Sequence, residues 1–330
     1  MHEFGNTTNG GQLSAVQRDG RPVPCGPMTK EEIPFFIVGS ARSGTTLLRL
    51  MLNAHPEVAV PPESRFITQL WPGGGSVEVQ PLLEALAAHP RFTAWELPID
   101  AVRAELQGAG AVPYAEFVRG VFRAYARAHG KSRWGDKTPR YVENIASLSN
   151  LLPDARFIHL IRDGRNVALS YADVPFGPKT VARAADLWAR RVSGGIEAGA
   201  SLGSGRYLEL LYENLVADPA GGARAICKFL DLDFHEVMLD PSERARGVLS
   251  RAAQFNPNLQ NKPISELRSW ESVMSARQVE MFEAVAGGLL SQLGYPRRYS
   301  STSFRARVAA RLSKSGLPVG RLKPTRKPQN

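Results

Sequence analysis

The sequence predicts an α/β fold in which a mostly parallel sheet is covered by helices on both faces. Strand-like segments recur at residues 34–38, 57–60, 132–134, 156–161 and 206–212, and helical patterns separate them. This alternation is typical of parallel strands joined by crossover helices. With 330 residues, of which 43% are hydrophobic and 22% charged, the chain is long enough to bury a large core.

The first elements follow a lead, residues 1–32, whose Gly, Asn and Thr content predicts disorder. A buried strand over 34–38 leads into the turn GSARSGTT, and an apolar helix follows over Thr45–Ala54, ended by His55-Pro56. The turn matches the phosphate-binding pattern G-x-x-x-x-G-K-[ST] except that Thr45 stands where the pattern has lysine. The order strand, turn, helix, together with the alternation that follows, predicts a three-layer P-loop-type domain.

The later elements are predicted from hydrophobic periodicity. WPGGGS at 71–76 indicates a hinge into a helical insertion over about 77–130, which includes a helix at Tyr114–Ala128. Further helices are expected at Gly164–Ala172, about 180–200, Pro219–Leu230 and about 275–292. Residues 301–330 carry eight Lys and Arg residues and no acid, most of the net charge of +10, and we expect a flexible basic tail there.

The turn has the chemistry of an anion cradle. The backbone N–H groups from Arg42 to Thr46 lie at the N-terminus of the following helix, where the helix dipole favours negative charge. The hydroxyls of Ser43, Thr45 and Thr46 can donate further hydrogen bonds, and Arg42 supplies a positive charge. Without the lysine that contacts β- and γ-phosphates, the loop suits a nucleotide with one phosphate at its 5′ side. The alternative function for such a loop is that of a P-loop small-molecule kinase.

A second motif, RFIHLIRDGRNVALSY, spans residues 156–171. Arg162 follows a buried strand, Asp163-Gly164 form a turn, and Ser170 comes eight residues after Arg162, about two helical turns along. Arg162 and Ser170 contact one anion only if the helix packs back along the strand. His159 alternates within the apolar strand, which favours a core histidine over a catalytic base.

Four stretches together resemble the sulfotransferases that use 3′-phosphoadenosine 5′-phosphosulfate (PAPS): GSARSGTTLLRLMLNAHPEV, PPESRF, DKTPRY and FIHLIRDGRNVALSY. The resemblance is closer to the tyrosylprotein and heparan types and their bacterial relatives than to the cytosolic small-phenol type. It covers about residues 33–300 and implies a sulfotransferase domain there. The resemblance implies that the 5′-phosphosulfate and the 3′-phosphate are held by different residues. These are Arg42, Ser43, Gly44, Thr45 and Thr46 for the first, and Arg162 and Ser170 for the second.

The resemblance also implies a catalytic set: Glu63 as the base, Arg65, and Lys137 beside the transferred group. Tyr212 and Lys262 match further donor-binding positions. The reaction it implies is an in-line, metal-independent transfer of a sulfuryl group from PAPS to a hydroxyl, leaving 3′-phosphoadenosine 5′-phosphate (PAP). The histidine base of the cytosolic type has no counterpart near DKTP, which is one reason to place the base at Glu63.

The sequence also limits the possible binding partners and the cellular location of the protein. No apolar run approaches the roughly 20 residues that cross a bilayer, and no signal peptide is evident, so we expect a cytoplasmic enzyme. The composition, rich in Ala, Arg and Gly, indicates a bacterial source. Neither a metal cluster nor specific nucleic-acid binding is expected. The acceptor is predicted to be a small-molecule, carbohydrate or lipid hydroxyl. The other alternative is a non-enzymatic RNA or membrane-surface binder that acts through the basic tail.

Overall fold

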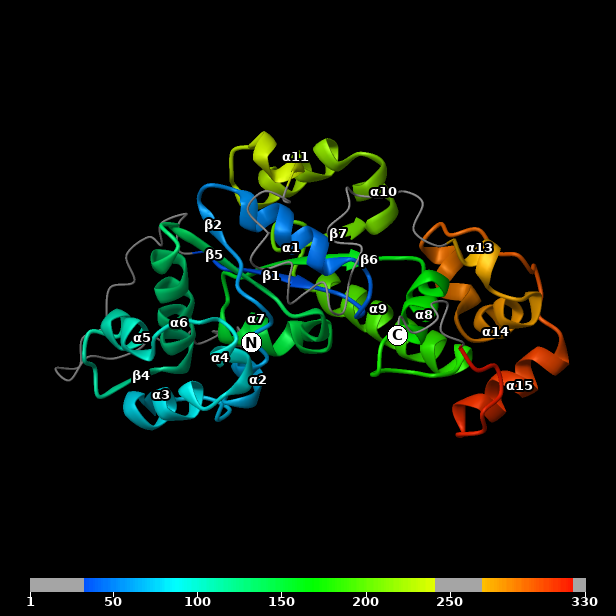
Figure 1. Ribbon diagram of the computed structural model, residues 1–330, viewed down its shortest axis with the longest axis horizontal. Coiled ribbons are helices and arrows are strands. Elements are labelled where there is room, and N and C mark those ends of the chain that lie inside the picture. The colour runs from blue at the N-terminus through cyan, green and yellow to red at the C-terminus, as the bar shows by residue number, and fades with distance from the viewer. Residues whose placement is uncertain (1–32, 241–268, 323–330) are drawn as a thin grey trace, which may run out of the picture.

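A computed structural model of the chain describes residues 33–240 and 269–322. Its centre is a five-stranded sheet with the order β2-β5-β1-β6-β7, in which every neighbouring pair is parallel (Figure 1). The strands are β1 (Phe35–Val38), β2 (Val58–Ala59), β5 (Arg133–Lys137), β6 (Arg156–Ile161) and β7 (Tyr207–Leu211). The predicted α/β class and mostly parallel sheet are confirmed.

Helices connect the strands and cover the sheet. Those predicted from periodicity lie at α1 (Thr45–Ala54), α6 (Tyr114–Ala128), α8 (Gly164–Ala172), α9 (Val181–Ala200), α11 (Pro219–Leu230) and α14 (Ala276–Gln292). Shorter elements are α2 (Phe66–Gln69), η2 (Pro139–Asn144), α7 (Ile145–Leu151), α10 (Tyr212–Ala217), η3 (Glu236–Leu239) and α13 (Trp270–Val273).

The central strand β1 shows how both faces of the sheet are buried. Because successive side chains of a strand point to opposite faces, Phe35 and Ile37 pack with α1 and α11 on one face. Phe36 and Val38 pack on the other face, in a core that extends into α6 and α7. Figure 1 shows α1 and α11 on one side of the strands and α7 and α9 on the other.

The segment over about 77–130 is mainly helical. It holds α3 (Val79–Ala87), α4 (Pro90–Thr93), α5 (Ile99–Glu105) and α6. The sequence analysis missed one feature, an antiparallel pair of short strands, β3 (Ser76–Glu78) and β4 (Ala111–Pro113). These strands are too short to show an alternating pattern, and they bring the two ends of the intervening helices together.

Two further differences from the sequence analysis concern polar segments. Strand β5 extends to Lys137 because Gly135 lets it pass the Phe35 ring, where a Cβ would come within 2.3 Å of ring atoms. The flexible tail expected over 301–330 contains helix α15 (Phe304–Lys314), which packs on α9 and α14 through Ala306, Ala309 and Ala310. Small side chains allow this close packing despite the basic composition.

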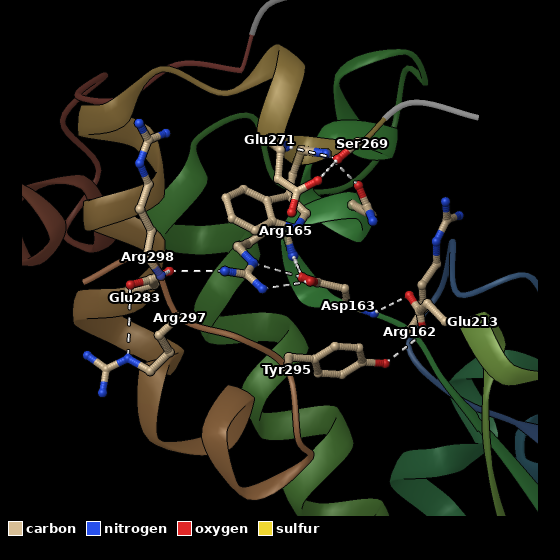
Figure 2. Close-up of polar contacts among 12 residues, drawn as sticks. Arg162, Asp163, Arg165, Glu213, Ser269, Glu271, Glu283, Tyr295, Arg297 and Arg298 are labelled. Atoms are coloured by element: carbon tan, nitrogen blue, oxygen red, sulfur yellow. Dashed lines mark hydrogen bonds and ion pairs between the residues drawn. The ribbon is translucent and has the colours of Figure 1, made fainter. Parts of the chain in front are cut away.

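A buried group of charges joins α8 to α14 (Figure 2). The fully buried Arg165 donates to both oxygens of Asp163, from Nε at 3.0 Å and from NH2 at 2.8 Å, and from NH1 to Glu283 Oε1 at 3.0 Å. Its guanidinium lies 3.7 Å from the centroid of the Trp270 ring. Glu283 also accepts hydrogen bonds from the backbone N–H groups of Arg298 and Tyr299.

We expect Arg165→Leu to lower the free energy of unfolding by about 3–5 kcal/mol, because it leaves two carboxylates buried without their cation. Urea denaturation at neutral pH measures this. The control is Arg190→Gln, which breaks the exposed pair with Asp186 and should cost about 0–1 kcal/mol. Equal, small losses in both variants would contradict a structural role for the Arg165 charges.

Candidate active site

The predicted site residues follow the carboxyl ends of the five parallel strands. β1 leads into the turn at 39–44, β5 ends at Lys137, and β6 is followed by Arg162. β7 is followed by Tyr212, and the chain leaving β2 reaches Glu63. Because carboxyl ends of parallel strands share one edge of the sheet, segments far apart in the sequence meet there.

The turn before α1 is held open by two glycines. Gly44 has φ 93°, and a Cβ on it would lie 2.4 Å from the Tyr212 ring. Gly39 has φ 156°, and a Cβ there would lie 2.5 Å from the carbonyl oxygen of Leu160. The Gly39 N–H donates to Pro139 O at 3.1 Å, which ties the turn to the segment after Lys137. Only glycine fits this cradle without displacing its neighbours.

Arg42, Ser170 and Arg162 lie together. Arg42, with φ 76°, donates from Nε to Ser170 Oγ at 2.9 Å, and Arg162 donates from NH1 to Arg42 O at 3.4 Å. Arg162 also lies 4.4 Å from the centroid of the Tyr212 ring. Burial and then the neighbouring Arg162 charge lower the pKa of Arg42. The hydrogen bond to Ser170 directs the Arg42 side chain to the Ser170 side of the site.

The donor groups of the cradle suit an anion. The Ser43 hydroxyl and Arg162 Nε are buried and make no hydrogen bond to any residue that the structure describes. Helix α1 has no acidic residue in its first turn, so its own side chains do not offset the positive end of the helix dipole. Buried donors without partners are costly, and a bound phosphate or sulfate would satisfy them.

Glu63 and Lys137 form the central pair of the site. Lys137 Nζ donates to Glu63 Oε1 at 3.1 Å, and Arg65 NH2 approaches Glu63 Oε2 at 3.5 Å. Burial by itself raises the pKa of Glu63, but the charges of Lys137 and Arg65 outweigh it and hold this pKa below its ordinary value. Glu63 is thus a carboxylate at neutral pH. Burial lowers the pKa of Lys137, and the Glu63 carboxylate opposes that shift.

The segment that carries Glu63 is fixed along its length. On α1, Arg49 Nε donates to Val60 O at 3.0 Å, and Asn53 Oδ1 accepts from Val60 N at 2.9 Å. Past Val60, Trp95 Nε1 donates to Pro62 O at 2.9 Å, and Ser64 N donates to Thr138 Oγ1 at 3.1 Å. Two neighbouring turns of α1, the insertion and the end of β5 thus orient Glu63.

Sequence reasoning missed Arg49, which is 4% exposed and whose charge interacts with those of Glu63 and Lys137. A usable signal existed, because Arg49 stands four residues after Thr45, on the helix face that begins at the phosphate loop. Asp136, adjacent to Lys137, is also fully buried. Burial raises its pKa from 3.8 to about 7, although the Ser64 and Thr138 hydroxyls oppose the rise.

Other predictions concern residues away from this group. Lys262 lies outside the described residues. His159 is buried with its Nδ1 2.6 Å from the Tyr207 hydroxyl, in the core, and burial lowers its pKa to about 3. Within residues 33–240 and 269–322 there is no group of three or more His, Cys, Asp or Glu that could hold a metal ion. No helix of these residues is long and apolar enough to cross a bilayer.

Comparison with known proteins identifies the class. A model of the sulfotransferase family matches residues 34–236, more than half of the chain. The chain therefore belongs to the sulfotransferase family, whose members are PAPS-dependent enzymes. The reaction class of this family is the transfer of a sulfuryl group from PAPS to a hydroxyl.

Curated relatives include protein-tyrosine sulfotransferases of animals. The chain is 27% identical to that of Drosophila melanogaster over 280 residues, 80% of this chain and 52% of the fly protein. It is 25% identical to protein-tyrosine sulfotransferase 2 of Gallus gallus, over 81% of this chain and 70% of that protein. The chain thus spans about half the length of the fly relative.

Two solved sulfotransferase domains share the fold. The domain of the olefin synthase of Synechococcus PCC 7002 is 26% identical, with a TM-score of 0.54, over 82% of this chain and 98% of that one. The domain of the curacin biosynthetic pathway is 20% identical, with a TM-score of 0.57, over 80% and 98%.

The buried Asp136 gives a pH-dependent prediction. With a pKa of about 7 in the folded protein and an ordinary value of 3.8, its carboxyl keeps a proton that the unfolded chain has lost. Wild-type stability should therefore fall as pH rises from about 4 to about 7, by about 4 kcal/mol relative to Asp136→Asn.

Urea denaturation of both proteins at a series of pH values measures this difference. Asp100→Asn, at an 85% exposed aspartate, is the control and should show no such trend. A difference between wild type and Asp136→Asn that is constant with pH would mean that Asp136 is ionised in the folded protein.

Proposed function

We propose that this protein transfers the sulfuryl group of PAPS to an acceptor hydroxyl in-line and without a metal, with Glu63 as the base. The observation that carries the proposal is the ion pair between Glu63 and Lys137 at the sheet edge that also bears the anion cradle. Family membership supports the reaction class. The buried donors without partners support an anionic donor substrate.

The donor would be held by the two motifs. Residues Arg42 to Thr46 would bind the 5′-phosphosulfate through backbone N–H groups and hydroxyls. Arg162 and Ser170 would bind the 3′-phosphate, and Arg42, which contacts Ser170, would contribute to that side as well. Tyr212 would support both motifs, because its ring lies against Gly44 and against the Arg162 guanidinium. PAPS supplies an activated sulfuryl group with PAP as the leaving group.

Glu63 would accept the proton of the acceptor hydroxyl as the new O–S bond forms and the bond from sulfur to the 5′-phosphate oxygen breaks. Its lowered pKa keeps it ionised at neutral pH, and its fixed segment keeps it in position. Lys137 would stabilise the negative charge that develops on the sulfuryl oxygens and the leaving phosphate. Arg42 and Arg162, the cations of the two motifs, would take the place that Mg²⁺ has in kinases.

The acceptor that we propose is a hydroxyl of a carbohydrate, a lipid or a small molecule. It would approach Glu63 on the side of Arg65, whose side chain is 41% exposed. Trp95, between α4 and α5 of the insertion, donates a hydrogen bond to Pro62 O, one residue before Glu63. The insertion would therefore shape the acceptor side of the site.

The 3′-phosphate site predicts nucleotide selectivity. Wild-type protein should bind PAP at least tenfold more tightly than AMP, since a charged hydrogen bond contributes about 1.5–3 kcal/mol. Isothermal titration calorimetry measures both affinities. Arg162→Ala should narrow the gap, whereas Arg140→Ala, at an exposed arginine of η2, should leave it unchanged. Equal affinities of the wild type for PAP and AMP would refute the assignment.

If Glu63 is the base, its loss should lower turnover without changing the affinity for the nucleotide. Glu63→Gln keeps the size of the side chain and removes its basicity, so kcat should fall by about 10²–10⁴ while PAP affinity is nearly unchanged. A sulfur-labelled donor with a saturating acceptor gives kcat. The matched control, Glu57→Gln, changes an exposed glutamate of the same segment and should retain full turnover. Near-normal turnover of Glu63→Gln would place the base elsewhere, with Asp136 or His55 the next candidates.

A further inference from the structure

Helix α15 presents large apolar side chains to solvent. Phe304 is 73% exposed, Leu312 42% and Val308 39%. Because these residues are four apart, they form one row along the helix. We call Phe304, Val308 and Leu312 the apolar row. Leu317, just beyond the helix, is 50% exposed.

The orientation of α15 is the reverse of that of an ordinary surface helix. Helices of soluble proteins turn their large apolar side chains to the core and polar ones to water. Here Ala306, Ala309, Ala310 and Ser313 face the protein, and the apolar row faces away. The small residues fill the contact with α9 and α14, so rotating the helix to bury the row would bring bulky side chains into that contact.

The orientation is also fixed by polar contacts. Ser303 caps the helix by accepting from Ala306 N at 3.2 Å, and its own N–H donates to Glu280 of α14 at 2.8 Å. At the other end, the buried Ser313 hydroxyl donates to Thr180 Oγ1 at 2.9 Å. Past the helix, Leu322 N donates to Lys179 O at 2.9 Å. The row is therefore a fixed surface of the folded domain.

Positive charge lies on both sides of the apolar row. At 100° per residue, Arg305 falls on one flank, and Arg311 and Arg307 fall on the other; all three are exposed. The stretch 301–330 holds eight basic residues and no acidic one, whereas the rest of the chain carries 33 Lys and Arg against 31 Asp and Glu. Most of the net charge of the protein is thus carried by the stretch of sequence that contains this helix.

We propose that α15 docks the protein on the surface of an anionic lipid bilayer, with the apolar row in the headgroup region and the flanking arginines on lipid phosphates. An apolar row flanked by arginines is the composition of helices that lie in a membrane interface. In Figure 1, α15 lies at the outer edge of the molecule, at the end opposite the insertion, where a flat surface can reach it. The inference is independent of the proposed reaction.

Sedimentation of the full-length protein with lipid vesicles tests the proposal. The protein should bind vesicles of phosphatidylcholine with phosphatidylglycerol and bind pure phosphatidylcholine much more weakly. Arg305→Gln/Arg311→Gln should weaken binding by roughly fivefold per arginine. Phe304→Ser/Leu312→Ser should weaken it about tenfold or more at the same net charge. The control, Val273→Ser, changes an exposed apolar residue of α13 and should bind as wild type does.

Two results would overturn the proposal. If Phe304→Ser/Leu312→Ser binds anionic vesicles as tightly as wild type, the basic segment adsorbs by charge alone and the apolar row does not insert. If the wild type ignores vesicles but forms dimers in sedimentation velocity that Phe304→Ser/Leu312→Ser abolishes, the row is an interface between copies of this chain. Urea denaturation of each variant establishes that it is folded.

Discussion

The site depends on the buried guanidinium of Arg165. Shielded from water, this cation is compensated by Asp163, Glu283 and the Trp270 ring, which surround it. The contacts fix the turn between β6 and α8, from which Arg162 points away from the cluster (Figure 2). Glu213 extends the fixed region, because it accepts from Asp163 N and from the Tyr295 hydroxyl and adjoins Tyr212 in the chain.

Two kinds of electrostatic environment therefore lie at one edge of the sheet. Arg165 is fully compensated and stabilises the fold, whereas Arg162 and the start of α1 have buried donors without partners among the residues that the structure describes. The second arrangement is costly in an isolated protein and becomes favourable when an anion binds. Glu63 and Lys137 lie between these extremes, because they are paired with each other while the Glu63 side chain remains 23% exposed. The charges around Arg165 are thus more completely compensated than those of the candidate site.

The sequence predicted the sheet and most long helices because their hydrophobic runs are strong and end at clear glycine, proline or polar signals. It could not reveal the pairing of Arg165 with Glu283, 118 residues away, since that contact depends on how α14 docks. The end of β5 was missed because Gly135, Asp136 and Lys137 look like a loop. The spacing of Arg49 from Thr45 indicated the helix face of the phosphate loop, but its bond to Val60 O depends on how the chain after β2 packs on α1. The order of α15 was missed because its basic charge concealed a packing face of alanines.

Transfer of label from sulfur-labelled PAPS to pooled carbohydrate, lipid and small-molecule alcohols, in the presence of excess EDTA, tests the central claim most directly. The account predicts a labelled product together with stoichiometric PAP, undiminished by EDTA, because this chain's own cations neutralise the transferred group. Mg²⁺-dependent transfer of phosphate from ATP, with no label transferred from PAPS, would contradict the account. The protein would then be a P-loop kinase.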